Sequence, residues 1–490
     1  MKIAKLSSLF LAALMLLSSV SCSAPADTAG NDTTAPEASV TSADTKAPEE
    51  TKIVYSADIP EGTDMDGYEF RIMVNDESHY WVDINFMHEE ENGNYINDAV
   101  LFRERAAEEK LNINLLPIPS PNASGATQKF VSADEDASDL VFLSPAGTMN
   151  LITEGMFLEL NRDVPNLDLT NPWWDQNAAA DLSMVDKLFM VYGDISMMYK
   201  RTMSVCLFNK NLVTDLSLAN PYELVEQNNW TYESVAALGK GVAQDINNDG
   251  AYTMGEDMMV TGYSADQLPI LLISGGNFIT TKDDEDIPQL TFYNERMVSA
   301  YETLASWLFN DELAQLSGGS IDAFGAGKLL MVLCEMHCIP HLRNMEEDFG
   351  ILPFPKYEAS QDRYYHVINP NVACAMMIPI TVADPAQVGL VAEVLAAEGK
   401  NYITPAYYDY NLTSRDTRDE ESVGMLDIIF ATTTYDAAHI YDLGGVGTML
   451  RGLASTKNEN ITSAFEKISK SVQKYIDRSV EKYQEIEGVN

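Results

Sequence analysis

The stretch Leu188-Phe-Met-Val-Tyr-Gly-Asp-Ile-Ser-Met-Met-Tyr-Lys-Arg-Thr-Met-Ser-Val-Cys-Leu-Phe-Asn-Lys-Asn-Leu212 divides the chain into two halves. Two apolar runs, 188–191 and 203–208, have the length of strands and flank a polar segment. We predict that the chain leaves one α/β lobe here and enters a second. Residues 194–202 would then lie beside a cleft between the lobes, where small ligands preferentially bind.

The N-terminus has the pattern of an export signal. Lys2 and Lys5 precede an apolar run of 12 residues, 6–17, which is too short to span a bilayer. Small residues lead to Cys22, and the arrangement resembles a bacterial lipoprotein signal, in which that cysteine becomes the lipidated first residue. Ser19 stands where that signal usually carries Leu, so cleavage by a general signal peptidase stays an alternative.

Composition sets the limits for the rest of the chain. Residues 23–55 hold almost no large apolar side chain, which predicts a disordered acidic linker. The remaining length, about 430 residues, exceeds what one core supports and predicts two lobes. A formal net charge of −43 argues against nucleic acid as a partner. Besides Cys22 there are only four cysteines, too few for a disulfide framework in an exported chain of this length.

The first half reads as alternating strands and helices. Strands are predicted at 67–74, 111–118 and 139–145, with a helix at 97–111 between the first two. This order predicts parallel pairing in an open α/β sheet. Ligands of such sheets bind at the carboxyl ends of strands, which here are the loops 75–83 and 144–148.

The second half continues the pattern. Thr231 caps a predicted helix, and residues 324–341 are predicted to form a turn, a strand and then a loop or helix start. Residues 349–355 read as an edge strand because proline ends them, and 372–380 as a strand that crosses back between the lobes. A long amphipathic helix is expected at 461–486.

The most specific motif is Asp245-Ile-Asn-Asn-Asp-Gly-Ala-Tyr-Thr-Met-Gly-Glu256, which fits a calcium-binding loop at every position. Alternate side chains supply oxygen ligands, a backbone carbonyl adds one, and the final Glu can bind with two oxygens. The predicted ligands of a structural Ca²⁺ are Asp245, Asn247, Asp249, the carbonyl of Ala251, and Glu256. The alternative is a solvated turn without metal.

Two further groups of residues have more than one interpretation. Trp173 and Trp174 suit stacking on sugar rings, and core packing explains them equally well. A second set has the residue types of a zinc site at irregular spacing, which favours strand-end packing and cleft lining instead: Cys334, His337, Cys338 and His341.

Several segments in this order resemble the extracellular solute-binding proteins of ATP-driven (ABC) importers, in the family 1 branch that includes maltose-type sugar binders. They are Trp230-Thr-Tyr-Glu, Phe324-Gly-Ala-Gly-Lys, Phe349-Gly-Ile-Leu-Pro-Phe-Pro, and the region from Tyr407-Tyr-Asp-Tyr to Arg418-Asp-Glu-Glu-Ser-Val-Gly-Met-Leu-Asp. The resemblance implies a two-lobed, periplasmic-binding-protein-like (type II) α/β fold with crossing hinge strands. The expected lobes are 56–196 plus 378–442, and 197–377 plus 443–490.

The resemblance also implies a function without catalysis: capture of a carbohydrate, favouring an oligosaccharide, and delivery to the permease of an ABC transporter. The protein would sit in the periplasm or be lipid-anchored at the extracellular face of the cytoplasmic membrane. The strand end at 334–337 is expected to face the cleft, although it carries Glu335-Met-His337 where family members often have an aromatic. Candidate ligand-binding residues are Tyr80, Trp81, Trp173, Trp174, Tyr199, Glu335, His337 and Tyr407. The alternatives are a secreted carbohydrate-active enzyme and a cell-surface sensor or adhesin.

Overall fold

The computed structural model describes residues 53–76, 86, 90–408 and 419–487. Residues 54–490 form one compact unit, and 1–53 form another. The export signal, Cys22 and nearly all of the predicted linker therefore lie outside the described residues.

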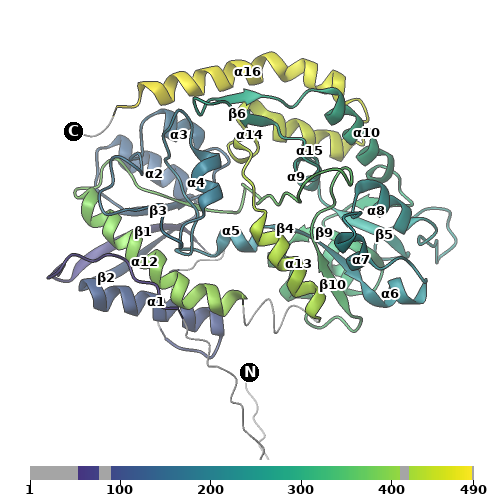
Figure 1. The fold of residues 1–490 in the computed structure, drawn as a ribbon, viewed down its shortest axis with the longest axis horizontal. Coiled ribbons are helices and arrows are strands. Elements are labelled where there is room, and N and C mark those ends of the chain that lie inside the picture. Colours follow the sequence, from purple (N-terminus) through teal and green to yellow (C-terminus); the bar gives the residue numbers. More distant parts are fainter. Residues whose placement is uncertain (1–52, 77–85, 87–89, 409–418, 488–490) are drawn as a thin grey trace, which may run out of the picture. The chain divides into compact units, whose positions relative to one another are not determined.

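The first half of the chain supplies three strands of a four-stranded sheet (Figure 1). Its order is β11-β3-β1-β2, with β1 (Tyr68–Asn75) parallel to β2 (Ile113–Ser120) and to β3 (Leu140–Leu143). The short strand β11 (Ala375–Met377) joins β3 from the far end of the sequence and runs antiparallel. The parallel sheet predicted from the strand–helix–strand order is confirmed.

Helices cover this sheet. α1 (Tyr95–Leu111) is capped by Asn94, whose side chain accepts from the N–H groups of Ile96 and Asn97, and the helix starts two residues before the predicted start at 97. α12 (Pro385–Pro405) packs along α1, as Figure 1 shows. The remaining helices of this half are α2 (Ala123–Ser132), α3 (Met149–Thr153), α4 (Gln176–Leu182) and α5 (Met198–Arg201).

A five-stranded mixed sheet lies in the second half, in the order β10-β4-β9-β5-β8. Every residue of β4 (Ser204–Asn209) is buried, as are all but the last of β9 (Leu329–Glu335), which explains their continuous apolar sequences. The predicted edge strand is β10 (Phe349–Leu352). The others are β5 (Met259–Tyr263) and β8 (Ala314–Leu316), and a separate hairpin pairs β6 (Thr280–Lys282) with β7 (Pro288–Leu290).

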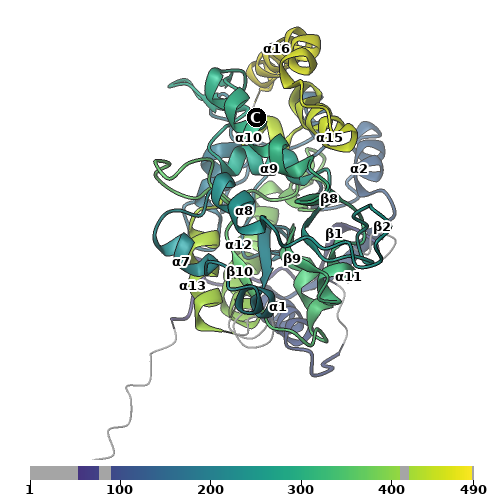
Figure 2. The ribbon, with the colours of Figure 1, turned by 90° about the vertical axis from the view of Figure 1, so that its right-hand side faces the viewer.

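The helices of the second half surround this sheet and extend beyond it. α8 (Tyr232–Gly239) begins with the predicted Thr231 cap, completed by Ser234. Figure 2 shows α15 (Val446–Thr456) beside the long C-terminal α16 (Ile461–Glu485). The rest are α6 (Lys210–Asp215), α7 (Pro221–Glu226), α9 (Gln267–Ser274), α10 (Glu295–Leu308), α11 (Ser320–Gly325), η1 (Met336–Leu342), α13 (Glu420–Ala431), α14 (Ala437–Ile440) and η3 (Leu443–Gly445).

Three extended segments lie side by side where the chain passes between the sheets. Met203 bridges to Ile368, and His366 bridges to Thr433. The N–H of Asn369 donates to the carbonyl of Thr202 (3.2 Å). These crossing segments, 202–204, 366–369 and 432–434, take the place of crossing hinge strands in the fold. The strand predicted to cross back, 372–380, instead lies in the first sheet, where it contains β11.

One predicted strand is wrong. Residues 188–191 are buried, but they pair with β11 only at Val191 and Met376. The N–H of Leu188 donates instead to the side chain of Glu159 (3.0 Å), so this run is an extended core segment. The predicted lobe boundaries stay a prediction, and α13, expected in the first lobe, contacts β10 of the second sheet.

Candidate ligand-binding site at the strand ends

Two polar residues mark the carboxyl ends of parallel strands in the first sheet. Asn75 is the last residue of β1, and Ser144 follows β3. The Asn75 amide lies 3.6 Å from the sulfur of Cys374, and the Ser144 hydroxyl donates to the carbonyl of Asn371 (3.1 Å). Both strand ends therefore contact the segment that precedes β11.

The sequence Asn369-Pro-Asn371 connects this edge to the second sheet. Asn369 is 9% exposed, and its side-chain amide donates to Glu335 Oε1 (3.3 Å) at the end of β9. Its own Oδ1 accepts from the N–H of Asn371 (3.0 Å), which fixes the turn. Asn371 is exposed. The carboxyl ends of strands from both sheets thus meet at one short polar turn.

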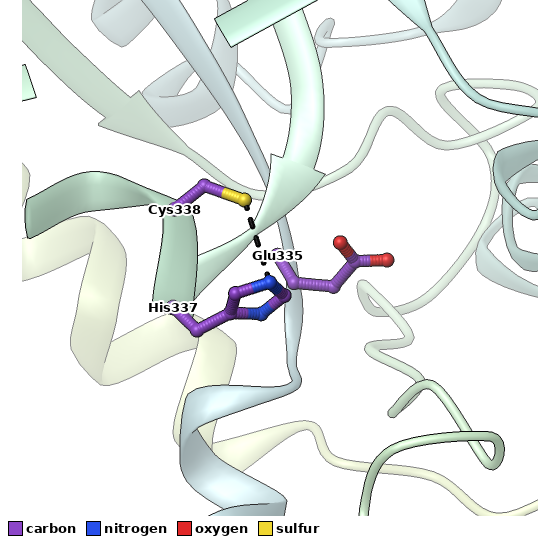
Figure 3. Close-up of side chains that lie close together, drawn as sticks. All are labelled: Glu335, His337 and Cys338. Atoms are coloured by element: carbon purple, nitrogen blue, oxygen red, sulfur yellow. Dashed lines mark hydrogen bonds between the residues drawn. The ribbon is translucent and has the colours of Figure 1, made fainter. Parts of the chain in front are cut away.

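The end of β9 contributes the charged part of the site. Glu335 is half-buried and also accepts from Gln267 Nε2 (3.1 Å). The chain then enters η1, where Pro340 cannot donate a helical hydrogen bond. This tight turn brings His337 and Cys338 next to Glu335, with the Cys338 sulfur 3.6 Å from His337 Nε2 (Figure 3).

Burial and proximity change the protonation of this cluster. A hydrogen bond from Cys334, reinforced by His337, lowers the pKa of the Cys338 thiol to about 4. Burial disfavours charge on His337, but the hydrogen bond and charge of Cys338 raise its pKa above the ordinary value. Burial raises the pKa of Glu335. The pKa of the thiol is thus lowered and that of the imidazole raised by their contact with each other.

Of the six predicted ligand-binding residues that the structure describes, it places Glu335 and His337 together at the end of β9. Tyr80 and Trp81 lie outside the described residues. Tyr199 is 8% exposed and lies against Tyr192, and Tyr407 is 5% exposed. Both tyrosines are packed into the interior.

Trp173 and Trp174 are also interior residues, at 4% and 3% exposure. Their indole N–H groups donate to the two carboxylate oxygens of Glu393, each at 2.9 Å. With rings and donors both engaged, neither tryptophan is placed to stack on a ligand. The core interpretation of this pair fits the structure better than the sugar-stacking one.

Asn75 and Ser144 are the first residues of the predicted strand-end loops 75–83 and 144–148, although neither was among the individual candidates. Asn369 and Asn371 were not predicted. The second pair depends on residues far apart in sequence meeting in space. An Asn-Pro-Asn turn after a strand-like run has no functional signature of its own.

Side chains within the predicted calcium loop form hydrogen bonds with one another. The amide of Asn247 donates to Asp249 Oδ2 (3.1 Å) and to Glu256 Oε2 (3.2 Å). Gly250 has a φ of +84°, as the sharp turn requires. The buried carboxylate of Asp257 accepts from the N–H groups of Ile246 and Thr253, both at 2.8 Å, and fastens the two ends of the loop.

A pocket of about 230 Å³ lies elsewhere, between β6 and the segment that begins α14. Two of the charged residues that line it, Lys282 and Asp181, already have partners. Lys282 Nζ donates to the carbonyl of Ala180 (2.6 Å), and Asp181 accepts from the N–H of Tyr435 (3.0 Å). The volume is below the roughly 300 Å³ at which small-molecule sites begin. The strand-end surface is therefore the better candidate for an extended ligand.

In the part of the chain that the structure describes, no helix is long and apolar enough to cross a membrane. The sequence matches no protein-family model and no curated protein. Solved structures do match. A cyclo/maltodextrin-binding protein complexed with maltotetraose has a TM-score of 0.55 at 12% identity, over 86% of this chain and 98% of that one.

Two more structures have the same architecture. An ABC substrate-binding protein from Listeria monocytogenes in complex with cycloalternan has a TM-score of 0.51 at 12% identity, over 86% of this chain and 100% of that one. UgpB from Mycobacterium tuberculosis in complex with glycerophosphocholine has a TM-score of 0.54 at 15% identity, over 78% and 95%. The predicted fold class is confirmed: the chain has the α/β fold of two-lobed, periplasmic-binding-protein-like solute binders, as the sequence resemblance indicated.

Proposed function

We propose that this protein is an extracellular solute-binding lipoprotein that captures a carbohydrate, an oligosaccharide, between two lobes and delivers it to the permease of an ABC transporter. One observation carries the proposal. Polar strand ends of both sheets converge on Asn369 and Asn371, in a fold whose neighbours include proteins complexed with maltotetraose and cycloalternan.

The strand-end surface is chemically suited to a sugar. Sugar hydroxyls both donate and accept hydrogen bonds, so they require mixed partners. Asn75, Asn369 and Asn371 supply amide donors and acceptors, Ser144 a hydroxyl, and Glu335 a carboxylate. Groups from both lobes touching one ligand would favour a closed arrangement over an open one. The crossing segments are where such a hinge motion would occur.

Asp194 supports the base of this hinge. It is 4% exposed, and its carboxylate pairs with Lys200 (2.6 Å) and Lys400 (3.1 Å). It also accepts from the Thr404 hydroxyl (2.6 Å). The cluster ties the segment before the crossing, next to α5, to α12 on the first sheet. One end of the hinge would therefore stay fixed to the first lobe while the second lobe moves.

Membrane attachment and calcium complete the proposal. Lipidation of Cys22 rests on the export-signal pattern, and residues 23–55 would tether the body within roughly 30 Å of the membrane. For Ca²⁺, the contacts of Asn247 with Asp249 and Glu256 support a loop whose ligand side chains converge. Asp245, Asn247, Asp249, Glu256 and the carbonyl of Ala251 would hold the ion and brace the second lobe.

A thermal-unfolding screen tests the carbohydrate proposal. The panel is maltotetraose, cycloalternan, raffinose and glycerophosphocholine, with each compound analysed after incubation. We expect one sugar class to stabilise the chain by about 2.7 kcal/mol at 100 times its dissociation constant, and that sugar to be recovered intact. Cleaved sugar, or stabilisation by glycerophosphocholine alone, would contradict the proposal.

A further inference from the structure

The cluster at the end of β9 has features that sugar binding does not require. A thiol and an imidazole from consecutive residues lie against a carboxylate, and the candidate ligand atoms of Glu335, His337 and Cys338 all fall within 4.8 Å of one another. Among the described residues this is the one group of three such side chains that converges to this degree. Hydrogen bonding to a sugar needs no thiol at this position.

The geometry points to a binding site for a thiophilic divalent cation, Zn²⁺ in the first instance, formed by Glu335, His337 and Cys338 with one coordination position left open. This site does not rest on the proposed sugar function. It also differs from the zinc-type set that the sequence suggested, because exposed His341 lies outside the cluster and Glu335 enters it.

Distances between the ligand atoms fit this ion. Zinc bonds sulfur at about 2.3 Å and imidazole nitrogen at about 2.1 Å, so a tetrahedral site places these two atoms about 3.6 Å apart. Cys338 Sγ and His337 Nε2 are 3.6 Å apart. Figure 3 shows the Glu335 carboxylate pointing away from the thiol, and its ligand oxygen still lies within 4.8 Å of the sulfur and of the imidazole nitrogen.

Hydrogen bonding leaves the ligand atoms available. The bonds from Gln267 and Asn369 both fall on Glu335 Oε1, so Oε2 can bind a cation while the amides hold the carboxylate in place. His337 Nδ1 is buried and has no hydrogen-bond partner among the described residues. The imidazole is therefore not engaged in a structural role through that atom.

Charge also favours a dication here. The carboxylate of Glu335 and the thiolate of Cys338 together balance the two positive charges of Zn²⁺, while neutral His337 adds none. The Cys334 thiol donates to Cys338 and can continue to do so when Cys338 binds a metal. Three protein ligands with an open fourth position is the arrangement that admits water or a ligand oxygen.

Cobalt substitution tests this site. The full chain, kept in a phosphine reductant so that Cys334 and Cys338 stay thiols, is stripped of metal and titrated with Co²⁺ in the absence of sugar. We expect a thiolate-to-cobalt charge-transfer band and tetrahedral visible bands that saturate at one equivalent and disappear on addition of Zn²⁺. The Asp245–Glu256 loop offers only oxygen ligands and cannot produce the thiolate band.

Matched variants locate the metal. Cys338→Ala and His337→Ala should abolish the band, and Glu335→Gln should weaken Co²⁺ binding by at least about 10-fold. His341→Ala, on the same turn, and Cys374→Ala, a buried cysteine elsewhere, should leave it unchanged. Circular dichroism of each metal-free variant checks its fold. No band in the wild type, or a band that survives Cys338→Ala, would overturn the assignment, whatever the outcome of the sugar screen.

Discussion

Glu393, which is buried, and Glu335, which is half-buried, show how differently this chain uses the same side chain. Both oxygens of Glu393 accept hydrogen bonds, from Trp173, Trp174, Asn171 and the N–H of Asp168. Glu335 accepts two, both on Oε1, beside a histidine whose Nδ1 has no hydrogen-bond partner among the described residues. The hydrogen bonding of Glu393 is satisfied within the protein. The cluster around Glu335 still has polar atoms that can bind a group from outside the protein. Satisfied bonding indicates a structural role, whereas spare bonding capacity at a strand end indicates a functional one.

The largest effect on the free energy of unfolding is expected at the hydrogen-bonded cluster around Glu393. Glu393→Ala leaves two buried indole N–H groups and an amide without acceptors, so the free energy of unfolding should fall by about 3 kcal/mol. Urea unfolding measures this change. Sugar affinity of the folded fraction should match the wild type, and a weakened affinity would show that this cluster is not purely structural.

Acid should also lower the stability of the protein through two buried histidines. Burial lowers the pKa of His366, in a crossing segment, to about 3, and that of His439 to about 4. Because the folded state holds these histidines neutral, their contribution is complete above pH 6.5 and is lost as pH falls toward the folded-state pKa. The cost is about 1.4 kcal/mol per pH unit for each histidine.

The variant His366→Gln isolates this dependence. Burial raises the pKa of Asp436 to about 6, which opposes the histidines, but that group is present in both proteins. Between pH 6.5 and 4.5 the wild type should therefore lose stability more steeply than His366→Gln. Parallel pH profiles of the unfolding free energy would show that His366 is already accessible to protons in the folded state.

Calcium should give a smaller effect, in an exposed region. At ten times its dissociation constant, Ca²⁺ should stabilise the chain by about 1.4 kcal/mol, measured as the difference between calcium and chelator. Glu256→Gln should reduce this difference. Asp284→Asn, an equally exposed acid outside the motif, should retain it. Indifference of the wild type to chelator would reduce the loop to a turn.

The smallest effect on the free energy of unfolding is expected at the cluster of Glu335, His337 and Cys338. Glu335→Gln keeps an acceptor for Gln267 and Asn369, so the unfolding free energy should change by less than about 0.5 kcal/mol. Its effect should appear in ligand binding instead. A loss of several kcal/mol in urea unfolding would place Glu335 with Glu393 among the structural residues and remove the contrast between the two.

Local patterns predicted much of this fold. Strand–helix alternation identified β1, β2 and β3 and their parallel order, and Thr231 marked the start of α8 because capping depends on neighbouring residues. Residues 188–191 were mistaken for a strand because an apolar run does not reveal whether a partner strand is available; Met376 supplies only one bridge. The sequence therefore predicted that residues 188–191 are buried, but not whether they pair with a neighbouring strand.

The site was less predictable, for a related reason. Trp173 and Trp174 suggested sugar stacking because the sequence does not show Glu393, about 220 positions later, accepting from both indoles. The turn at 369–371 can be recognised as part of a site only in the folded chain, where Asn369 contacts Glu335 and Asn371 contacts Ser144. The predicted calcium ligands, by contrast, follow one another closely in the sequence, so they could be proposed without knowledge of the fold. Sites assembled from distant strands require the topology first.

Isothermal titration of the stabilising sugar into the wild type, Glu335→Gln and Glu393→Gln tests the central claim most directly. We expect a saturable heat at one site in the wild type and in Glu393→Gln. For Glu335→Gln we expect an affinity lower by at least about 10-fold, or roughly 1.4 kcal/mol. Equal affinity in all three proteins would contradict a binding site at the strand ends, and absence of heat with every sugar would contradict the carbohydrate function itself.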